Sequence, residues 1–139
     1  MGASDYDLVD MYCKQIRSVL ELAVPVWQGA LTLEDKIEIE RIQKSLAHII
    51  MGEQYQSYTM ALKHLKLESL EDRRNKICLN FAKKAESHPK FQYWFKPTDK
   101  KVNTRKNKPK YCDVKAKHSR LEKSPIAFLT RLLNQHYLK

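Results

Sequence analysis

The clearest structural signal in the chain is the stretch TLEDKIEIERIQKSLAHIIMG, residues 32–52. Thr32 and Asp35 stand three residues apart, which is the spacing of a capping box that begins a helix. Glu40 and Lys44 are predicted to pair on the solvent-facing side of that helix, because residues four apart are neighbours there. Apolar residues recur every three or four positions, and we expect them to form one buried stripe made of Ile39, Ile42, Leu46, Ile49 and Ile50.

The residues before this stretch predict a first helix. Ser4 and Asp7 have the spacing of another capping box. We expect the helix to run to about Leu22 and Pro25 to stop it, because proline clashes with the preceding turn of a helix. The apolar residues, which include Met11, cover a wide arc, so this helix is expected to contact more than one neighbour.

Further helices are predicted after Gly52, which is expected to end the central one. The second of them is limited by Pro89 and is expected to turn Leu70, Ile77, Cys78, Phe81 and Ala85 inward. The start signals of these helices are Ser57, Ser69 with Asp72, and Ser124 followed by Pro125.

Together these patterns predict an all-α fold. No run of strictly alternating apolar and polar residues is long enough for a strand. With 139 residues the chain can remove roughly two thirds of its unfolded surface from water. We therefore expect a compact bundle of four to five helices with a basic loop and a C-terminal helix. The expected division is a helical body in residues 1–95, a basic flexible segment in residues 96–123 and the C-terminal helix in residues 124–139.

Net charge is concentrated near the end of the chain. Residues 96–139 hold 13 lysines and arginines against three acidic residues, whereas residues 1–95 hold 13 of each kind. The whole formal charge of +10 therefore belongs to residues 96–139. A polyanionic partner for that end is the leading inference.

The segment from Lys96 to Arg120 is the candidate nucleic-acid-binding site. Cations at this density release condensed counterions when they meet a nucleic-acid backbone, which gives affinity without sequence readout. A solvated loop or a nuclear-localisation patch is the alternative reading. The candidate residues are Lys96, Lys100, Lys101, Arg105, Lys106, Lys108, Lys110, Lys115, Lys117 and Arg120.

Two neighbouring groups each allow two interpretations. The aromatic run FQYWF, residues 91–95, is expected to pack in the core, with stacking on unpaired bases as the alternative. Arg73 and Arg74 are expected to form structural salt bridges, with phosphate contact as the alternative.

Segments along most of the chain also carry a family resemblance. They are IRSVLELAVPVW (16–27), IERIQKSLAHII (39–50), YTMALKHLKLESLEDRRNKICLNFAKK (58–84), FQYWF (91–95) and YCDVKAKHSRLEKSPIAFLTRLLN (111–134). In this order they resemble the region after the polymerase palm in the reverse transcriptases of non-long-terminal-repeat retrotransposons. The resemblance implies a thumb-like helical domain that holds a template-primer duplex by its RNA or DNA backbone, with a palm domain as a further partner.

The same resemblance implies no catalysis by this chain on its own. A reverse transcriptase holds two divalent metal ions with palm carboxylates, including those of a Tyr-x-Asp-Asp turn. This sequence has no such turn. We therefore expect no catalytic residue and no cofactor.

Cysteine usage and hydropathy narrow the setting further. Cys13, Cys78 and Cys112 are an odd number at long spacings, so a disulfide framework is not expected. Cys112 with His118 or His136 hints at zinc, but a tetrahedral site needs four ligands, and we expect no metal. No apolar run approaches the roughly 18–20 residues that span a bilayer. We expect a monomer that lies in the nucleus or cytoplasm and does not associate with a membrane.

The competing hypothesis is a protein-interaction fragment with no nucleic-acid role. It would dock on a palm domain or on an acidic partner. The wide apolar arc of the first helix motivates this hypothesis, because exposed apolar surface of that size marks interaction sites.

Overall fold

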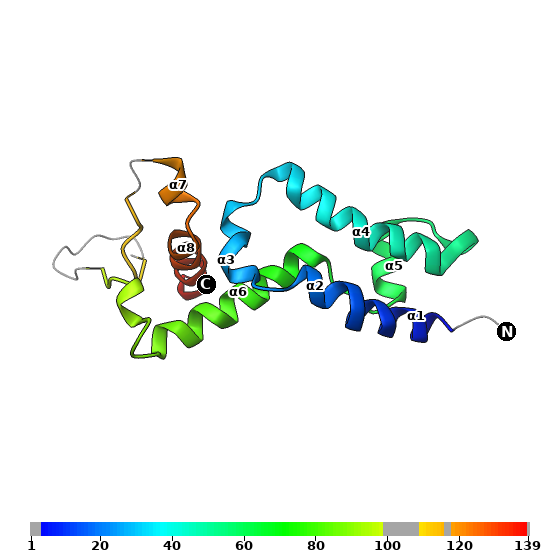
Figure 1. The fold of residues 1–139 in the computed structure, drawn as a ribbon, viewed down its shortest axis with the longest axis horizontal. Coiled ribbons are helices and arrows are strands. Elements are labelled where there is room, and N and C mark those ends of the chain that lie inside the picture. Colours follow the sequence, from blue (N-terminus) through cyan, green and yellow to red (C-terminus); the bar gives the residue numbers. More distant parts are fainter. Residues whose placement is uncertain (1–3, 99–108, 116–117, 139) are drawn as a thin grey trace. The chain divides into compact units, whose positions relative to one another are not determined.

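The computed structural model describes residues 4–98, 109–115 and 118–138. Helices dominate these residues (Figure 1). They contain no β-strand, only an isolated antiparallel bridge between Pro97 and Tyr111. The all-α prediction is confirmed.

The elements follow one another along the chain as helices and short helical turns. The first continuous stretch consists of α1 (Asp5–Met11), a π-helical segment (Tyr12–Arg17) and α2 (Ser18–Leu20). The later helices are α3 (Val24–Trp27), α4 (Leu33–Met51), α5 (Tyr58–His64), α6 (Leu70–Ser87), α7 (Ser119–Glu122) and α8 (Pro125–Tyr137). Short 3₁₀ turns occupy Gln28–Ala30, Gly52–Gln54 and Gln92–Trp94.

The helix starts lie where the sequence places them. Ser4 with Asp7 and Thr32 with Asp35 form reciprocal capping boxes at α1 and α4. Ser57, Ser69 and Ser124 each accept a hydrogen bond from a backbone N–H in the first turn of the following helix. Gly52 ends α4 with φ +48°, a conformation that L side chains rarely adopt. These signals act within one helical turn, so they need no tertiary context.

The first break in the helices differs from the expected one. The first helical stretch ends at Leu20, and a turn with Ala23 at φ +52° follows it. Pro25 therefore does not stop that helix. It is the second residue of α3, where a proline is tolerated because N–H groups in the first turn have no intrahelical partner.

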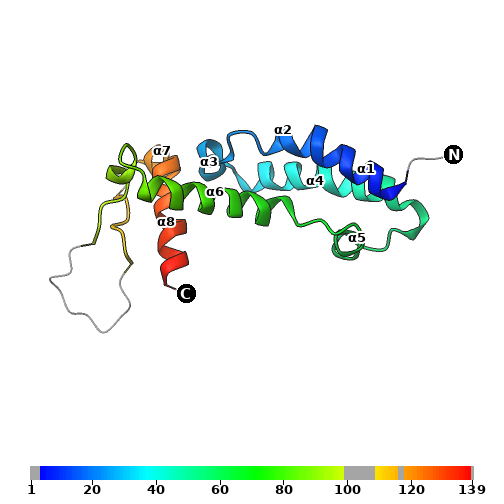
Figure 2. The ribbon, with the colours of Figure 1, turned by 90° about the horizontal axis from the view of Figure 1, so that it is seen from below.

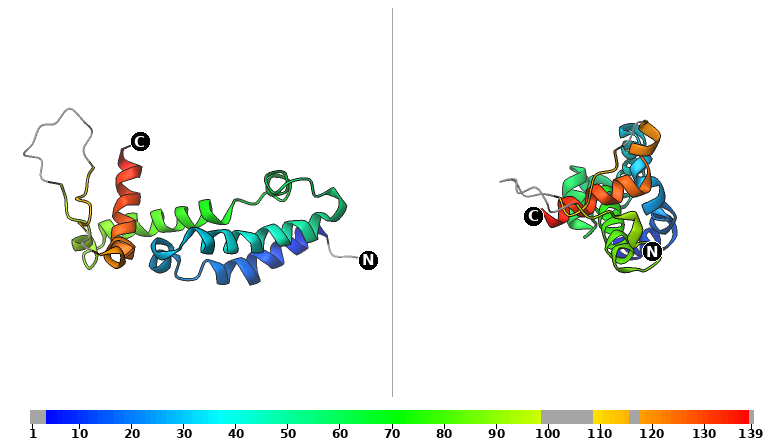
Figure 3. Two further views of the ribbon diagram at one scale, coloured as in Figure 1. Left: turned by 90° about the horizontal axis from the view of Figure 1, so that it is seen from above. Right: turned by 90° about the vertical axis from the view of Figure 1, so that its left-hand side faces the viewer.

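The contacts within the chain divide it into two compact units. Unit 1 is Met1–Val24 with Leu31–Asn75, and unit 2 is Pro25–Ala30 with Lys76–Lys139. In unit 1, α1 lies beside α4 (Figure 2). In unit 2, α8 runs across the C-terminal part of α6 (Figure 3).

A small apolar cluster and a polar network hold unit 1 together. Ala47, Ala61 and Leu65 are buried and pack against partly buried neighbours from the first helix, α4 and the α5 region. Beside them Gln43 is fully buried and accepts a hydrogen bond from the Tyr12 hydroxyl at 2.8 Å. Its amide nitrogen donates to the Tyr58 hydroxyl at 3.0 Å and to the carbonyl of Glu68 at 2.8 Å.

This network corrects the face predicted for α4. Ile42 and Ile49 are 43% and 76% exposed, whereas Gln43 and Ala47 are fully buried. Glu40 points inward as well, because its carboxylate accepts hydrogen bonds from the Tyr58 hydroxyl and from the backbone N–H of Leu70. The predicted pair with Lys44 is therefore wrong: Glu40 instead satisfies a backbone donor at the start of α6.

The inward face predicted for α6 is confirmed in part. Leu70, Cys78 and Ala85 are buried. Phe81 is 37% exposed, so its placement inside was wrong. Ala82, which has no large side chain to draw attention in the sequence, is fully buried instead. In α8, Leu129 and Leu133 are fully buried.

Candidate nucleic-acid interface

The start of the basic segment pairs with residues 110–112 of the same segment. Thr98 N–H donates to the carbonyl of Lys110 at 3.0 Å, and Cys112 N–H donates to the carbonyl of Lys96 at 2.8 Å. These bonds flank the bridge between Pro97 and Tyr111. These two short segments therefore pair through one backbone ladder, which we call the hairpin base (residues 96–98 and 110–112).

Asn134 of α8 fixes the hairpin base in place. Its side-chain oxygen accepts from the backbone N–H of Tyr111, and its side-chain nitrogen donates to the carbonyl of Tyr111, both at 2.9 Å. Asn134 is buried, and the Tyr111 ring packs against Phe95 with ring centroids 5.6 Å apart. A side-chain amide that matches both backbone groups acts like one more rung of the ladder. Lys96 and Lys110 consequently start from a defined backbone.

Glu86 of α6 bonds to polar groups of the hairpin base and of α8. Its carboxylate pairs with the Lys110 ammonium at 2.5 Å and accepts hydrogen bonds from the hydroxyls of Tyr111 and Tyr137, the latter at 2.7 Å. The Lys110 ammonium also lies 4.0 Å from the centroid of the Tyr137 ring, a cation–π distance. The cluster ties α6, the hairpin base and α8 to each other.

The pKa values within this cluster reflect these bonds. Burial alone would raise the pKa of Glu86, but the hydrogen bonds from Lys110, Tyr111 and Tyr137 outweigh it and lower that pKa below its ordinary value. The bond to Glu86 raises the pKa of Lys110. Burial and the same carboxylate raise the pKa of Tyr111 to about 12. At neutral pH the pair is therefore ionised, and both phenols stay protonated and donate.

Formal charge differs sharply between the two units. Unit 2 contains 17 lysines and arginines against four acidic residues, a charge of +13, whereas unit 1 carries −3. The sequence-based boundary at residue 96 missed part of this excess. Exposed cations of unit 2 that lie outside the predicted list are Lys76, Lys83, Lys84, Lys90, Lys123 and Arg131. Counting charge on each predicted helix would have revealed them.

The predicted binding residues differ in exposure and in ion pairing. Lys96, Lys115 and Arg120 are exposed and form no ion pair with the residues that the structure describes. Lys110 is paired with Glu86, so this one predicted cation is neutralised by the protein's own carboxylate. The other predicted residues lie outside the described ranges: Lys100, Lys101, Arg105, Lys106, Lys108 and Lys117.

The aromatic run before the hairpin base splits into packed and exposed members. Phe95 is 4% exposed and belongs to the core of unit 2. Phe91 packs against Trp94 with ring centroids 4.9 Å apart. Tyr93, in contrast, is 71% exposed. Packing therefore accounts for Phe95 but not for Tyr93.

The arginine pair of α6 is structural. Arg73 donates to the carboxylate of Glu21, which also lies 3.6 Å from Arg17, and this bond raises the pKa of Arg73. Arg74 is 1% exposed and so is not available to an external phosphate. The salt bridge predicted for Arg73 is confirmed, and the pairing of Arg74 with a carboxylate stays a prediction.

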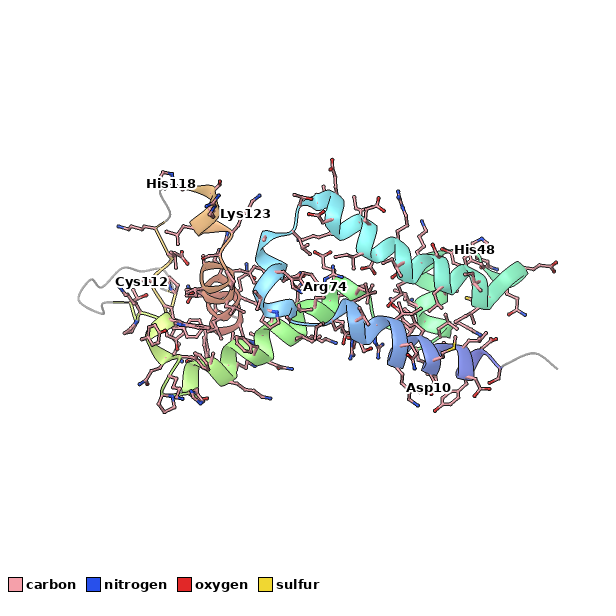
Figure 4. The ribbon with its side chains drawn as sticks, viewed as in Figure 1. Asp10, His48, Arg74, Cys112, His118 and Lys123 are labelled. Carbon is pink, nitrogen blue, oxygen red and sulfur yellow. The ribbon has the colours of Figure 1, made fainter. Side chains whose placement is uncertain are left out.

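Thiol and metal chemistry adds nothing to this site. Cys13, Cys78 and Cys112 are all free thiols. Figure 4 labels Cys112 and His118, which lie on separate parts of unit 2. Among the described residues no group of three or more His, Cys, Asp or Glu side chains is arranged to hold a metal ion.

Within the described ranges, no helix combines the length and the apolar character needed to cross a membrane. Comparisons with protein-family models, with curated proteins and with solved structures found no match.

Proposed function

We propose that this chain is a thumb-like, reverse-transcriptase-derived domain that binds the backbone of RNA or DNA nonspecifically through unit 2. It acts as a monomer, in the nucleus or cytoplasm, and without a palm domain it has no polymerase activity of its own. The family resemblance suggests this role. The observation that carries it is the charge of +13 on unit 2, beside −3 on unit 1.

The exposure of these cations supports contact with the phosphate backbone of a nucleic acid. Lys96, Lys115 and Arg120 are exposed, and Lys96 belongs to the hairpin base that Asn134 of α8 holds in place. Cations that pair with no carboxylate of the described residues can replace the counterions of a polyanion. Lys110 contributes less, because Glu86 already neutralises it.

A salt titration of binding tests the proposal. The affinity for a short fluorescent duplex is measured by anisotropy for the native chain and for the triple variant Lys96→Gln, Lys115→Gln and Arg120→Gln. If six phosphates are contacted, affinity falls about a thousandfold between ~50 and ~200 mM salt. Loss of three contacts lowers the slope of log K against log salt by about 2.7.

A matched variant controls for net charge. Lys44, Lys63 and Lys66 are exposed lysines of unit 1, and replacing all three with glutamine removes the same total charge. This variant should keep the slope of the native chain. The proposal is refuted if the native chain binds neither duplex nor single strand at low salt, or if both triple variants reduce the slope equally.

A second candidate function rests on apolar exposure. Met11, Val19 and Leu22 of the first helix and the turn after it are 54%, 68% and 73% exposed. Exposed apolar side chains in such numbers favour a protein-interaction fragment. Light scattering separates the two functions: a dimer or aggregate without affinity for nucleic acid supports interaction with protein, and a monomer that binds the duplex supports the first proposal.

A further inference from the structure

An open hollow lies between the aromatic run and the hairpin base. Its volume is about 680 Å³, and its lining includes Glu86, Gln92, Tyr93, Lys96, Pro97 and Lys110. Ligand pockets typically measure roughly 300–1,000 Å³. All of these residues belong to unit 2, which carries the positive charge.

Tyr93 presents an aromatic surface to solvent at the edge of this hollow. It occupies the middle of the 3₁₀ turn Gln92–Trp94, whose backbone is held by hydrogen bonds from Gln92 N–H to His88 and from Trp94 N–H to Phe91. Among the described rings its neighbour is Trp94, at 83° to it. A nearly perpendicular neighbour does not stack in parallel on Tyr93, so its ring remains available to a planar ligand.

The charges around the hollow favour an anion beside that ring. Lys96 is exposed and forms no ion pair with described residues. The carboxylate of Glu86 would repel a phosphate, but the Lys110 ammonium compensates its charge, and the hydroxyls of Tyr111 and Tyr137 donate hydrogen bonds to it. The uncompensated charge on the lining is therefore that of Lys96.

We infer that this hollow binds an unpaired nucleobase of a single strand, stacked on Tyr93, with the adjoining phosphate at Lys96. The inference rests on the proposed function and adds a preference for single strands to it. A paired base in a duplex keeps both faces stacked on its neighbours, whereas a single strand can turn a base outward. Every base has a π face, so this contact is tolerant of sequence.

Substitution of Tyr93 tests the inference. Stacking on an aromatic side chain contributes about 1–3 kcal/mol per base, which corresponds to a change of about 5- to 150-fold in affinity. Tyr93→Ala should weaken binding of a short fluorescent single strand by that factor and leave duplex binding within about twofold. Tyr93→Phe keeps the ring and should bind as the native chain does.

Tyr6 provides the matched control, because it is 79% exposed and lies in unit 1. Tyr6→Ala should change neither affinity. A single strand carrying 2-aminopurine adds a readout on the native chain, since its fluorescence is quenched when the base stacks. Separate titrations with DNA, with RNA and with a free mononucleotide identify which source of base and phosphate is held.

Three results overturn the inference. They are an unchanged single-strand affinity in Tyr93→Ala, an equal loss of single-strand and duplex affinity, and 2-aminopurine fluorescence that stays constant on binding. Each of these would leave the proposed function standing, provided that the salt slope still falls when Lys96, Lys115 and Arg120 are neutralised. Absence of all binding by the native chain would instead remove the proposed function itself.

Discussion

Replacing Gln43 with leucine should destabilise unit 1, although leucine is apolar and the site is fully buried. The native amide accepts from Tyr12 and donates to Tyr58 and to the Glu68 carbonyl. Burial raises the pKa of the Tyr12 hydroxyl, so it stays protonated at neutral pH and donates to Gln43. Gln43→Leu leaves that hydroxyl without its acceptor.

The size of the effect follows from the three bonds. Each hydrogen bond contributes about 1 kcal/mol net, so their loss lowers the free energy of unfolding by about 3 kcal/mol. Tyr58 keeps its bond to Glu40, whereas the Tyr12 hydroxyl and the Glu68 carbonyl lose the side-chain partner that Gln43 provides. Adding Tyr12→Phe removes the stranded hydroxyl, and the double variant should recover about 1 kcal/mol relative to the sum of the single changes.

Urea unfolding followed by far-ultraviolet circular dichroism measures these energies. This probe is required because Trp27 and Trp94 both lie in unit 2, so tryptophan fluorescence does not report directly on unit 1. Gln56→Leu, at an exposed position, should stay within about 0.5 kcal/mol of the native chain. The reasoning fails if Gln43→Leu is as stable as the native chain, or if the two changes at Tyr12 and Gln43 are simply additive.

Two further predictions concern unit 2. Gly29→Ala should lower the stability of unit 2 by about 1–3 kcal/mol in thermal unfolding, because a Cβ there would lie 2.7 Å from the Cβ of Phe128 and 3.1 Å from the Lys123 carbonyl. Ala30→Ser, at an exposed position, is the control. Equal melting temperatures of Gly29→Ala and the native chain would contradict the close approach. Glu86→Gln should lower the free energy of unfolding by about 1–2 kcal/mol at neutral pH, because a neutral amide forms weaker hydrogen bonds than a carboxylate. The pKa of Glu86 is lowered on folding, so its contribution is present above the ordinary pKa of 4.5 and is lost as pH falls through the folded value. The difference in free energy of unfolding between Glu86→Gln and the native chain should therefore become smaller in urea titrations below pH 4.5. A difference that stays constant down to the acid transition would argue against this role of Glu86.

The sequence predicted the helices better than it predicted their buried faces. Caps such as Thr32 with Asp35 act between residues three apart, so their effect is readable before any tertiary contact exists. The buried face of α4 was misjudged because an apolar count favours Ile42 and Ile49 over Gln43. A glutamine becomes a core residue only when Tyr12, Tyr58 and Glu68 supply its partners, and those residues are 31, 15 and 25 positions away.

The candidate site shows the same limit. Its charge could be counted from composition, and the hairpin base lies within the segment that the sequence already marked as basic. Nothing local indicated that Glu86 would neutralise Lys110 from 24 positions away, or that Tyr93 would be exposed while Phe95 is buried. Residues of similar character in one run receive different roles according to what packs on them.

The capped helix starts, the absence of strand patterns and the basic character of residues 96–139 were therefore determined by the sequence itself, because capping, periodicity and charge are local properties. The tertiary structure alone decided which face of α4 is buried, which lysine is neutralised and which aromatic ring meets solvent. Each of those outcomes depends on a side chain satisfying hydrogen bonds or excluding water with partners distant in the chain, and no local pattern records where such partners will lie.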